Sequence, residues 1–311
     1  MLTEDEFVQW LRGRASPHGR LAIGIGDDAA LVDWAGDRGL LVASDLLADA
    51  VHFELATTEP QRIGRKALAV NLSDVAAMAG RPVAATVSVL LPRSAGFALA
   101  RDLYEGLSQL AANYDVALAG GDTNTWDGPL VIEVTILAEP PKGGPLRRTG
   151  AQAGDWLLVT GSLGGSALGH HLDFEPRVRE AMRLVRAYDV HAGMDISDGL
   201  ALDLSRLAEA SGCGAIVDVS SLPISAAARE LASRPGEKLS ATDRAIGDGE
   251  DFELLLAMPP DGAQQLLADQ PFDVALTNIG TVVAERGLWQ RKADGGTAAL
   301  EPRGYRHGAD S

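Results

Sequence analysis

The sequence predicts an α+β fold built of two domains, and three observations support this prediction. The chain has 311 residues, which is long for one domain and ordinary for two packed domains. Its first half alternates segments typical of strands with segments typical of helices. A turn-rich segment at 139–155, "EPPKGGPLRRTGAQAGD", interrupts the alternation, and an α+β half follows it. We therefore expect an N-terminal domain over 1–139 and a C-terminal domain over 140–311.

The first half begins with a short amphipathic helix, which the spacing of apolar residues predicts within "MLTEDEFVQWLRGRAS". The small apolar run after "GIGDD" is typical of a buried strand, and "GLLVAS" at 39–44 predicts a second strand. Residues 62–80 are rich in alanine, have the spacing of a buried helix and end at a glycine. Beyond them we expect a strand at 83–91, an amphipathic helix at 96–113 and two strands in "VALAGGDT" and "PLVIEVTILAE".

The second half opens with a predicted strand, "WLLVTG", followed by a helix after "SLGGSALGHH". Further on we expect a helix in "GLALDLSRLAEAS" and strands near 215–219, 252–258 and 274–283. The glycine-rich segment "GSLGGSALG" follows a strand, but its spacing fits no nucleotide-binding fingerprint. Its first interpretation is therefore a turn into a helix, and contact with a phosphate is the second.

The charge and cysteine content exclude several classes of protein. Lys and Arg total 27 against 43 Asp and Glu, a formal net charge of −16, which argues against a nucleic-acid or anionic-membrane surface. The acidity fits a protein that gathers cations, although it also serves solubility. The single cysteine, Cys213, excludes a disulfide within the chain and a thiolate metal cluster. With no signal-like N-terminus and no membrane-spanning apolar run, we expect a cytoplasmic protein.

Aspartates recur beside apolar segments, and several of them have a structural as well as a functional interpretation. Asp45 could cap a helix that begins at Leu46. Asp122 could form a turn, and Asp198 could cap a helix that begins at Gly199. These single positions therefore leave both interpretations open.

Asp74 is less easily explained by local structure. It lies in the middle of the predicted helix, among alanine, valine and leucine, and Asn71 shares its face. A carboxylate in such a helix needs a cation or a polar partner, because burial penalises its charge. Hard cations such as Mg²⁺ take oxygen ligands. Residues that supply such ligands from five separate stretches are Asp28, Asp45, Asp74, Asp122 and Asp195.

Motifs for covalent catalysis and for a P-loop are missing from the sequence. There is no "GxxxxGK[ST]" and no "GxSxG", and the single cysteine lies in "ASGCGA", where a helix is expected to end. The aspartates therefore favour metal-assisted chemistry over a serine or thiol nucleophile.

Taken in order, seven motifs resemble thiamine-monophosphate kinase, a family related to aminoimidazole ribonucleotide synthetase and selenophosphate synthetase. They are "GIGDDAA", "SDLLADAVHF", "KALAVNLSDVAAM", "AGGDT", "RRTGAQAGDWLLVTGSLG", "MDISDGLALDLSRLAEASG" and "GDGEDFELLL", with a weaker echo in "GYRH". The resemblance implies two α/β domains of the aminoimidazole ribonucleotide synthetase type and a homodimer joined through the N-terminal sheet. It also implies ATP-dependent phosphorylation of thiamine monophosphate to thiamine diphosphate, by in-line transfer with several Mg²⁺ ions.

The resemblance also implies functional residues, position by position. The implied metal ligands are Asp27, Asp28, Ser44, Asp45, Asp74, Asp122, Asp195 and Asp198. The implied ATP contacts are Tyr104, Gly121, Asp122, Arg148 and Ser197. His52, Glu250 and Tyr305 would line the thiamine site. No general base is implied, because the acceptor is a phosphate monoester that is largely ionised at neutral pH.

The chain departs from the family pattern at four places. Ala43 stands where the family usually has Ser or Thr, which puts one hydroxyl ligand in doubt. Asp248 replaces a usual glycine and adds a charge beside the substrate site. The loop "GGDTNTWDGP" is longer than usual, and the segment after "GHH" is shorter. None of these changes removes one of the implied aspartates.

Other interpretations stay open at the level of sequence. The chain could be another ATP-dependent member of the superfamily, such as an aminoimidazole ribonucleotide synthetase-like enzyme, or a non-catalytic nucleotide-binding subunit. From the residues alone, Arg148 could equally be a surface arginine in a turn. His52 could be a hydrogen-bonded histidine at a strand end, and Tyr305 an aromatic residue of the tail.

Overall fold

The computed structural model describes residues 21–23, 27–34, 39–292 and 295–306, and the predicted N-terminal helix lies outside them. The first half contains β1 (Leu21–Ile23), β2 (Ala30–Val32), β3 (Leu40–Ala48), α2 (Pro60–Ala77), β4 (Arg81–Pro92), α3 (Gly96–Asn113), β5 (Ala117–Trp126) and β6 (Val131–Glu139). These strands form a six-stranded sheet in the order β1-β2-β3-β6-β4-β5. Its pairs are antiparallel except for β4 with β5.

The second half forms a seven-stranded sheet with shorter helices around it. Its elements are β7 (Trp156–Thr160), η1 (Ser166–Leu168), α4 (His170–Asp173), α5 (Val178–Ala187), β8 (Ala192–Asp195), α6 (Leu200–Ser211), β9 (Gly214–Asp218), η2 (Val219–Ser221), α7 (Ala226–Ala232), α8 (Ala241–Gly247), β10 (Leu254–Met258), α9 (Pro260–Asp269), β11 (Leu276–Val283), β12 (Gly287–Arg291) and β13 (Thr297–Ala299). The strand order is β13-β12-β9-β11-β7-β10-β8, and only β12 with β9 is parallel. The architecture is therefore α+β, as predicted.

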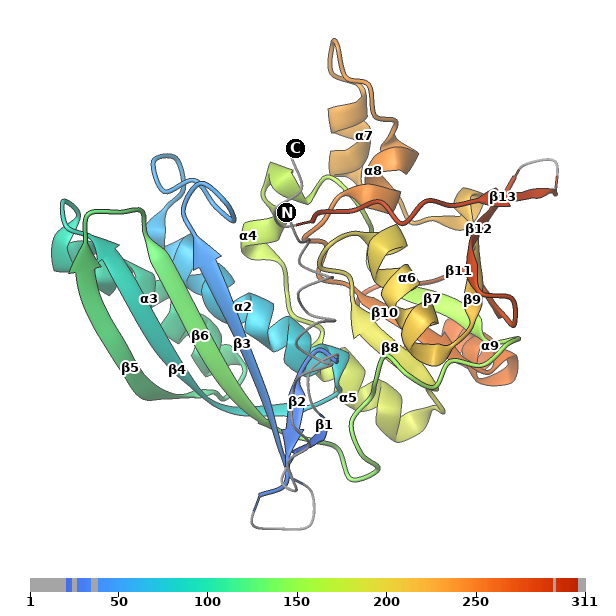
Figure 1. Cartoon of the computed structure of the whole chain (residues 1–311), viewed down its shortest axis with the longest axis horizontal. Helices are drawn as coiled ribbons and strands as arrows, with labels where there is room; N and C mark the ends of the chain where they lie inside the picture. The colour runs from blue at the N-terminus through green and yellow to red at the C-terminus, as the bar shows by residue number, and fades with distance from the viewer. Residues whose placement is uncertain (1–20, 24–26, 35–38, 293–294, 307–311) are drawn as a thin grey trace.

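The two faces of the first sheet have different surroundings. Figure 1 shows α2 and α3 behind this sheet, whereas no helix of the described residues covers its front face. Along β6 every second residue is buried, among them Ile132, Val134 and Ile136, so this row faces the helices. On the other face, Leu46 is 57% exposed and Leu90 is 38% exposed. We call this bare side of the six-stranded sheet the outer face.

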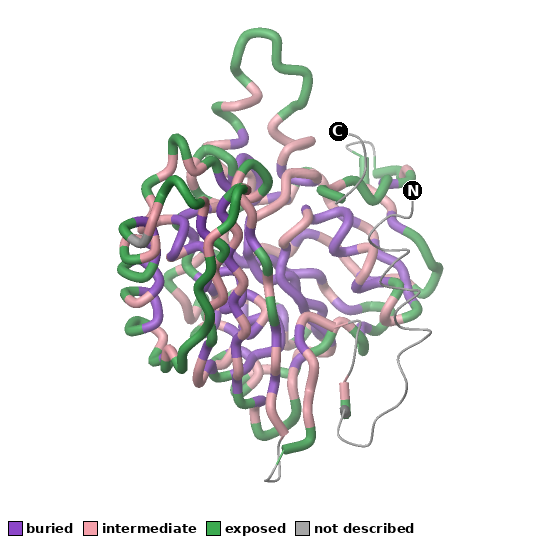
Figure 2. The backbone as a smooth tube through the Cα atoms, turned by 60° about the vertical axis from the view of Figure 1, so that its left-hand side comes forward, coloured by how far each residue is buried: buried purple, intermediate pink, exposed green. Residues whose placement is uncertain are grey.

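Helix α2 occupies the centre of the molecule. It packs against β3 and β6 of the first sheet, against α4 and α5, and against β8 of the second sheet. One apolar core therefore joins both halves, with Leu72 of α2 in the same cluster as Leu172 and Phe252. Figure 2 shows the buried residues gathered in the middle of the molecule and an exposed tip, which is the loop between α7 and α8.

Two glycines allow α2 and α3 to pack in direct backbone contact. A Cβ atom at Gly64 would lie 1.9 Å from the carbonyl oxygen of Leu103, and one at Gly106 would lie 1.8 Å from that of Gln61. Neither position has room for a side chain. The pair therefore fixes how closely the two helices approach, and with that the place of α2 between the sheets.

Most of the predicted elements are confirmed, with changes at their ends. The helix expected at 62–80 is α2, and the one expected at 96–113 is α3. Asp45 does not cap a helix, because β3 continues through it to Ala48, and Asp122 lies within β5 rather than in a turn. The short elements α7, α8, α9, β12 and β13 were not predicted. Among the described residues, no helix combines the length and apolar character needed to cross a bilayer.

Candidate functional site

A cleft of about 760 Å³ opens between the two halves of the molecule. Its walls come from the end of β3 and the turn after it, from α2, from the segments around η1 and at 244–252, and from the C-terminal stretch. Seven residues implied by the sequence line it: Ser44, Asp45, His52, Ser197, Asp198, Glu250 and Tyr305. The fold therefore brings predicted metal, nucleotide and thiamine residues together from distant parts of the chain.

Three carboxylates converge beside this cleft. One oxygen each of Asp28, Asp74 and Asp195 lies within 4.8 Å of the others. Asp28 lies in the turn before β2, Asp74 near the end of α2 and Asp195 at the end of β8. Asp45 at the cleft wall lies close enough to Asp74 for its charge to raise the pKa of Asp74, and it extends the group to four. We call Asp28, Asp45, Asp74 and Asp195 the acidic cluster.

In the acidic cluster, burial and mutual repulsion outweigh the compensating charge of Arg148 for Asp74 and Asp195. Burial raises the pKa of Asp74 well above its ordinary value, and the charges of Asp45, Asp195 and Asp28 raise it further. Burial and the charge of Asp28 do the same to the pKa of Asp195. Burial also raises the pKa of Asp45 to about 6, and its Oδ2 atom is buried without a hydrogen-bond partner among the described residues. Such oxygen atoms fit a hard divalent cation, because a cation would relieve both the repulsion and the missing contact.

Arg148 joins the linker between the halves to the acidic cluster. Its guanidinium forms a two-point ion pair with Asp28, with Nε 3.0 Å from Oδ2 and Nη2 2.7 Å from Oδ1. Its backbone amide donates to Asp27 at 3.2 Å, and burial together with the charge of Asp28 raises the pKa of Asp27. Asp27 and Asp28 are therefore held at the turn by Arg148, at the place where the sequence predicted a nucleotide contact.

The turn between β8 and α6 carries Ser197 and Asp198. Asp198 does not cap α6, because the residue before the helix is Gly199 and no side chain caps it. Instead, Oδ2 of Asp203 accepts hydrogen bonds from the backbone amides of residues 197, 198 and 199, at 2.9 to 3.1 Å. The carboxylate of Asp198 pairs with Arg206 and lines the cleft. The buried carboxylate of Asp203 in α6 therefore holds the turn, so the carboxylate of Asp198 is not needed to form it.

The structure does not bring every implied residue to the acidic cluster. Burial alternates along β3, so Ser44 lies on the outer face, where its hydroxyl donates to Glu133 at 2.6 Å. The side chains of Ser44 and Asp45 leave the strand on opposite faces, although both residues line the cleft, so a metal contact by the Ser44 hydroxyl stays a prediction. Asp122 lies on the edge strand β5, three strands from β3, or about 14 Å at the usual strand spacing. Tyr104 and Gly121 line a separate groove of about 310 Å³ between α3 and the sheet.

The three implied thiamine residues meet in the cleft. Nδ1 of His52 accepts a hydrogen bond from the amide of Ala48 at 3.1 Å, so Nε2 carries the proton of the neutral ring. Tyr305 lies at the rim, 47% exposed, and its amide donates to the carbonyl of Asp198 at 2.8 Å. The carboxylate of Glu250 pairs with Lys66 of α2. Lys66 was missed at the sequence level, although a charge among the alanines of α2 is the same signal that singled out Asp74.

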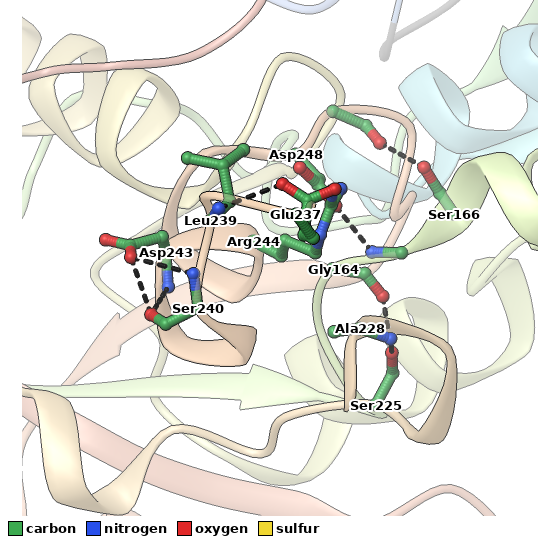
Figure 3. Close-up of polar contacts among 12 residues, drawn as sticks. Gly164, Ser166, Ser225, Ala228, Glu237, Leu239, Ser240, Asp243, Arg244 and Asp248 are labelled. Atoms are coloured by element: carbon green, nitrogen blue, oxygen red, sulfur yellow. Dashed lines mark hydrogen bonds and ion pairs between the residues drawn. The ribbon is translucent and has the colours of Figure 1, made fainter. Parts of the chain in front are cut away.

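The glycine-rich loop before η1 is braced by carboxylates. The amide of Gly165 donates to Asp248 at 2.8 Å, and the amide of Gly164 donates to Asp251 at 2.9 Å. Figure 3 shows Asp248 between this loop and Arg244. Because acids already occupy these amides, the first interpretation of the loop, a turn into a helix, is the one observed. Among the described residues that line the cleft, Arg244 is the one cation, and the sequence analysis did not single it out.

Comparisons with known proteins agree with this geometry. Models of the AIR synthase related protein family match residues 26–139 with its N-terminal domain and residues 152–288 with its C-terminal domain. The thiamine-monophosphate kinase of Rhodopirellula baltica is 43% identical, over 98% of this chain and 97% of its own. That of Escherichia coli is 35% identical, over 92% of this chain and 91% of its own.

Solved structures give the same result. AaThiL complexed with AMPPCP and TMP superposes with a TM-score of 0.84 at 28% identity, covering 98% of this chain and 97% of that one. The hydrogenase maturation protein HypE of E. coli has a TM-score of 0.74 at 22% identity, over 97% of this chain and 98% of its own. At that identity the likeness to HypE shows the fold alone.

Proposed function

This chain belongs to the thiamine-monophosphate kinase family and phosphorylates thiamine monophosphate with ATP, and from this premise we infer that divalent cations bound by the acidic cluster align the two phosphates. The observation that carries this proposal is the convergence of Asp28, Asp74 and Asp195 from three elements. They lie beside the cleft that also holds Ser197 and Glu250.

The donor set of the acidic cluster suits Mg²⁺. All four residues offer carboxylate oxygens, which are the ligands that Mg²⁺ takes alongside water and phosphate oxygens. The buried Oδ2 of Asp45 offers a ready ligand, and Asp198 lines the same cleft. When bound, Mg²⁺ neutralises the charge of the transferring phosphoryl group and of both polyphosphate partners.

The protein's own contribution is binding and alignment. The acceptor phosphate is largely ionised at neutral pH, so attack on the γ-phosphorus requires no side chain to remove a proton. Two anions must still be held in line, because phosphoryl transfer depends on the alignment of the attacking and leaving oxygens. We assign Arg148 and Ser197 to the nucleotide, and His52, Glu250 and Tyr305 to the thiamine half of the acceptor.

The decisive experiment measures ADP release by the purified protein with ATP alone and with ATP plus thiamine monophosphate. We expect ADP release that depends on thiamine monophosphate, requires Mg²⁺ or Mn²⁺, and stops reversibly when EDTA removes the metal. Metal-independent turnover would contradict the role of the acidic cluster. Release without an acceptor would favour another superfamily activity, and no release would favour a non-catalytic nucleotide-binding subunit.

We also propose that the protein works as a cytoplasmic homodimer whose two copies meet through the outer face. The outer face supports this because it carries exposed apolar side chains, among them Leu46 and Leu90, which no helix in the described part of the chain covers. The single cysteine, Cys213, is buried and unpaired, which suits a reducing compartment. We retain the domain boundary at 139/140, which agrees with the gap between the two family matches.

A further inference from the structure

We propose that Lys66 is a positioning residue for thiamine monophosphate, which acts by holding Glu250 at the floor of the cleft. The inference rests on the proposed function, because that function gives Glu250 its role in binding the acceptor. Lys66 itself does not line the cleft, so it acts through the carboxylate that does.

Lys66 is a charge placed where a helix of this kind ordinarily has an apolar residue. Its side chain has no exposed surface, and it is the largest fully buried side chain among the described residues. Burial lowers its pKa, and the charge of Glu250 beside it acts in the opposite direction. A buried ammonium group is strongly destabilising unless its donors are bonded. The presence of a lysine at this buried position is therefore explained by its hydrogen-bond partners and not by apolar packing.

The partners of Lys66 are both parts of the thiamine site. Nζ donates to Oε1 of Glu250 at 2.5 Å and to the backbone carbonyl of His52 at 2.6 Å. These residues come from separate segments, the turn after β3 and the segment before β10. One ammonium group thus links the segment that carries His52 to the segment that carries Glu250. Both segments are expected to contact the thiamine moiety.

Glu250 is held in a conformation that it would not adopt by itself. Its φ angle is +62°, in the left-handed region that residues with a side chain rarely occupy. Its amide donates to the carbonyl of Ser197 at 2.6 Å, and its carboxylate is fixed by Lys66. Backbone strain of this kind persists only where the surroundings impose it, and it is common in binding sites. Lys66 is one of the contacts that hold Glu250 in place, together with the bond to Ser197 and the bond from the Ser166 hydroxyl to the carbonyl of Gly249.

The ion pair also decides which kind of contact Glu250 can offer. Lys66 occupies Oε1, while Oε2 accepts no hydrogen bond from the described residues and the side chain stays 31% exposed to the cleft. The charge of the pair is balanced, so recognition depends on a directed hydrogen bond from an N–H group of the aminopyrimidine more than on net attraction to the thiazolium. A directed bond requires a fixed acceptor, and Lys66 fixes it.

Helix α2 places this contact relative to the acidic cluster. Lys66 and Asp74 lie on the same helix, eight residues apart, which corresponds to about 12 Å along the axis. The ring-binding end and the phosphate-binding end of the acceptor site are therefore set by one buried helix. Loss of Lys66 would loosen the first end and leave the second in place.

The test compares the KM values for thiamine monophosphate and for ATP in Lys66→Met, which removes the charge while keeping an unbranched side chain that suits a helix. We expect KM for thiamine monophosphate to rise about tenfold, the size of one charge-assisted hydrogen bond, and KM for ATP to change less than about twofold. Arg65→Met is the matched control. It removes an ion pair between the neighbouring position of α2 and Glu175, away from the cleft, and should leave both KM values unchanged.

A second comparison asks whether Lys66 acts through Glu250. In a Glu250→Ala background, we expect Lys66→Met to change KM for thiamine monophosphate less than about twofold, because the carboxylate that it positions is gone. Glu250→Ala alone should lower the melting temperature by leaving the ammonium group buried without its counterion, and Lys66→Met should restore it. Additive effects on KM would overturn the inference.

The outcomes separate this inference from the proposed function. If the unaltered protein does not phosphorylate thiamine monophosphate, the proposed function fails before any variant is compared. If it does, and Lys66→Met raises both KM values equally or neither, the positioning role of Lys66 is wrong. Should Lys66→Met not fold, Lys66→Gln keeps a donor without the charge. A smaller rise confined to thiamine monophosphate then supports the inference, and no rise or an equal change for both substrates overturns it.

Discussion

Buried charged side chains occur in two different kinds of surroundings within this molecule. Lys66 meets its counterion inside the protein, so the pair is complete without a ligand. Asp74 and Asp195 instead face one another and Asp28, so their charges add rather than cancel. The first arrangement suits a residue that positions another residue, and the second suits residues that bind a cation.

The substitution Asp74→Asn tests the acidic cluster at this scale. We expect kcat to fall by at least about a hundredfold, because one of the groups that hold charge-stabilising cations is lost. The protein should still fold, since the apolar residues of α2 remain buried. The measurements are steady-state kinetics and thermal unfolding, with the exposed acid variant Asp261→Asn as control. A collapsed melting curve with normal activity in the folded fraction would make Asp74 a structural residue.

The pH dependence of stability gives a second prediction for the same residues. Burial raises the pKa of Asp74 and Asp195 above 3.8 and that of Asp45 to about 6, so the folded chain binds protons that the unfolded chain has already lost. These groups therefore make metal-free protein less stable as pH rises from about 4 through about 6 and beyond. The quantity to compare is the melting temperature of Asp74→Asn minus that of the wild type, both in EDTA. This difference should be larger at about pH 8 than at about pH 5. A difference that does not change with pH would show that Asp74 is not desolvated as described.

At the scale of elements, the position of α2 depends on its contact with α3. Its buried residues face both sheets, so a shift of the helix would move Asp74 and Lys66 together. Such a shift is prevented where the two helices touch through backbone atoms. The residues that permit this contact, Gly64 and Gly106, do not line the cleft and carry no chemistry.

Gly106→Ala tests this contact against ordinary helix propensity. Alanine in an exposed helix stabilises by roughly 0.5–1 kcal/mol relative to glycine. Here the new Cβ would meet the carbonyl oxygen of Gln61 at 1.8 Å, so we expect a net loss of about 1–3 kcal/mol in the free energy of unfolding. Urea unfolding measures the change, and Gln109→Ala on the exposed side of α3 serves as control. A stabilised Gly106→Ala variant would mean that the helices can separate freely.

At the scale of the whole molecule, the two sheets are used differently. The seven-stranded sheet and α6 enclose a separate apolar core, which supports the turn with Ser197 and Asp198. Among the residues that the structure describes, helices cover the six-stranded sheet on one side only, and Asp122 lies on the edge strand with its neighbours exposed. The second half of the molecule therefore completes the cleft, while the first half also presents an open surface.

Leu46→Glu tests the use of that surface. We expect light scattering to give the mass of two chains for the wild type and of one chain for the variant, because a buried charge opposes packing of two outer faces. Leu239→Glu changes another exposed leucine, in the loop between α7 and α8, and should remain dimeric. A wild-type protein with the mass of one chain would exclude the proposed homodimer.

The sequence by itself determined the long elements and the strongest chemical signals. The two long helices were recognisable because their apolar spacing extends over eighteen residues each, and Asp74 because a carboxylate is costly inside such a helix. The order of the acidic motifs also indicated the family. The short helix α8 was missed even though Ser240 and Asp243 form a capping box, a signal that the sequence contains.

Only the tertiary structure decided which of these residues meet. Lys66 and Glu250 are separated by 184 positions, and no local pattern relates their charges. Ser44 was separated from Asp45 by the pleat of β3, and Asp122 from the acidic cluster by the order of strands in the sheet. Local sequence determines helices, strands and the cost of burying a charge, because these depend on near neighbours. Which charges compensate one another depends on contacts between distant segments, and those exist only once the two sheets have packed against α2.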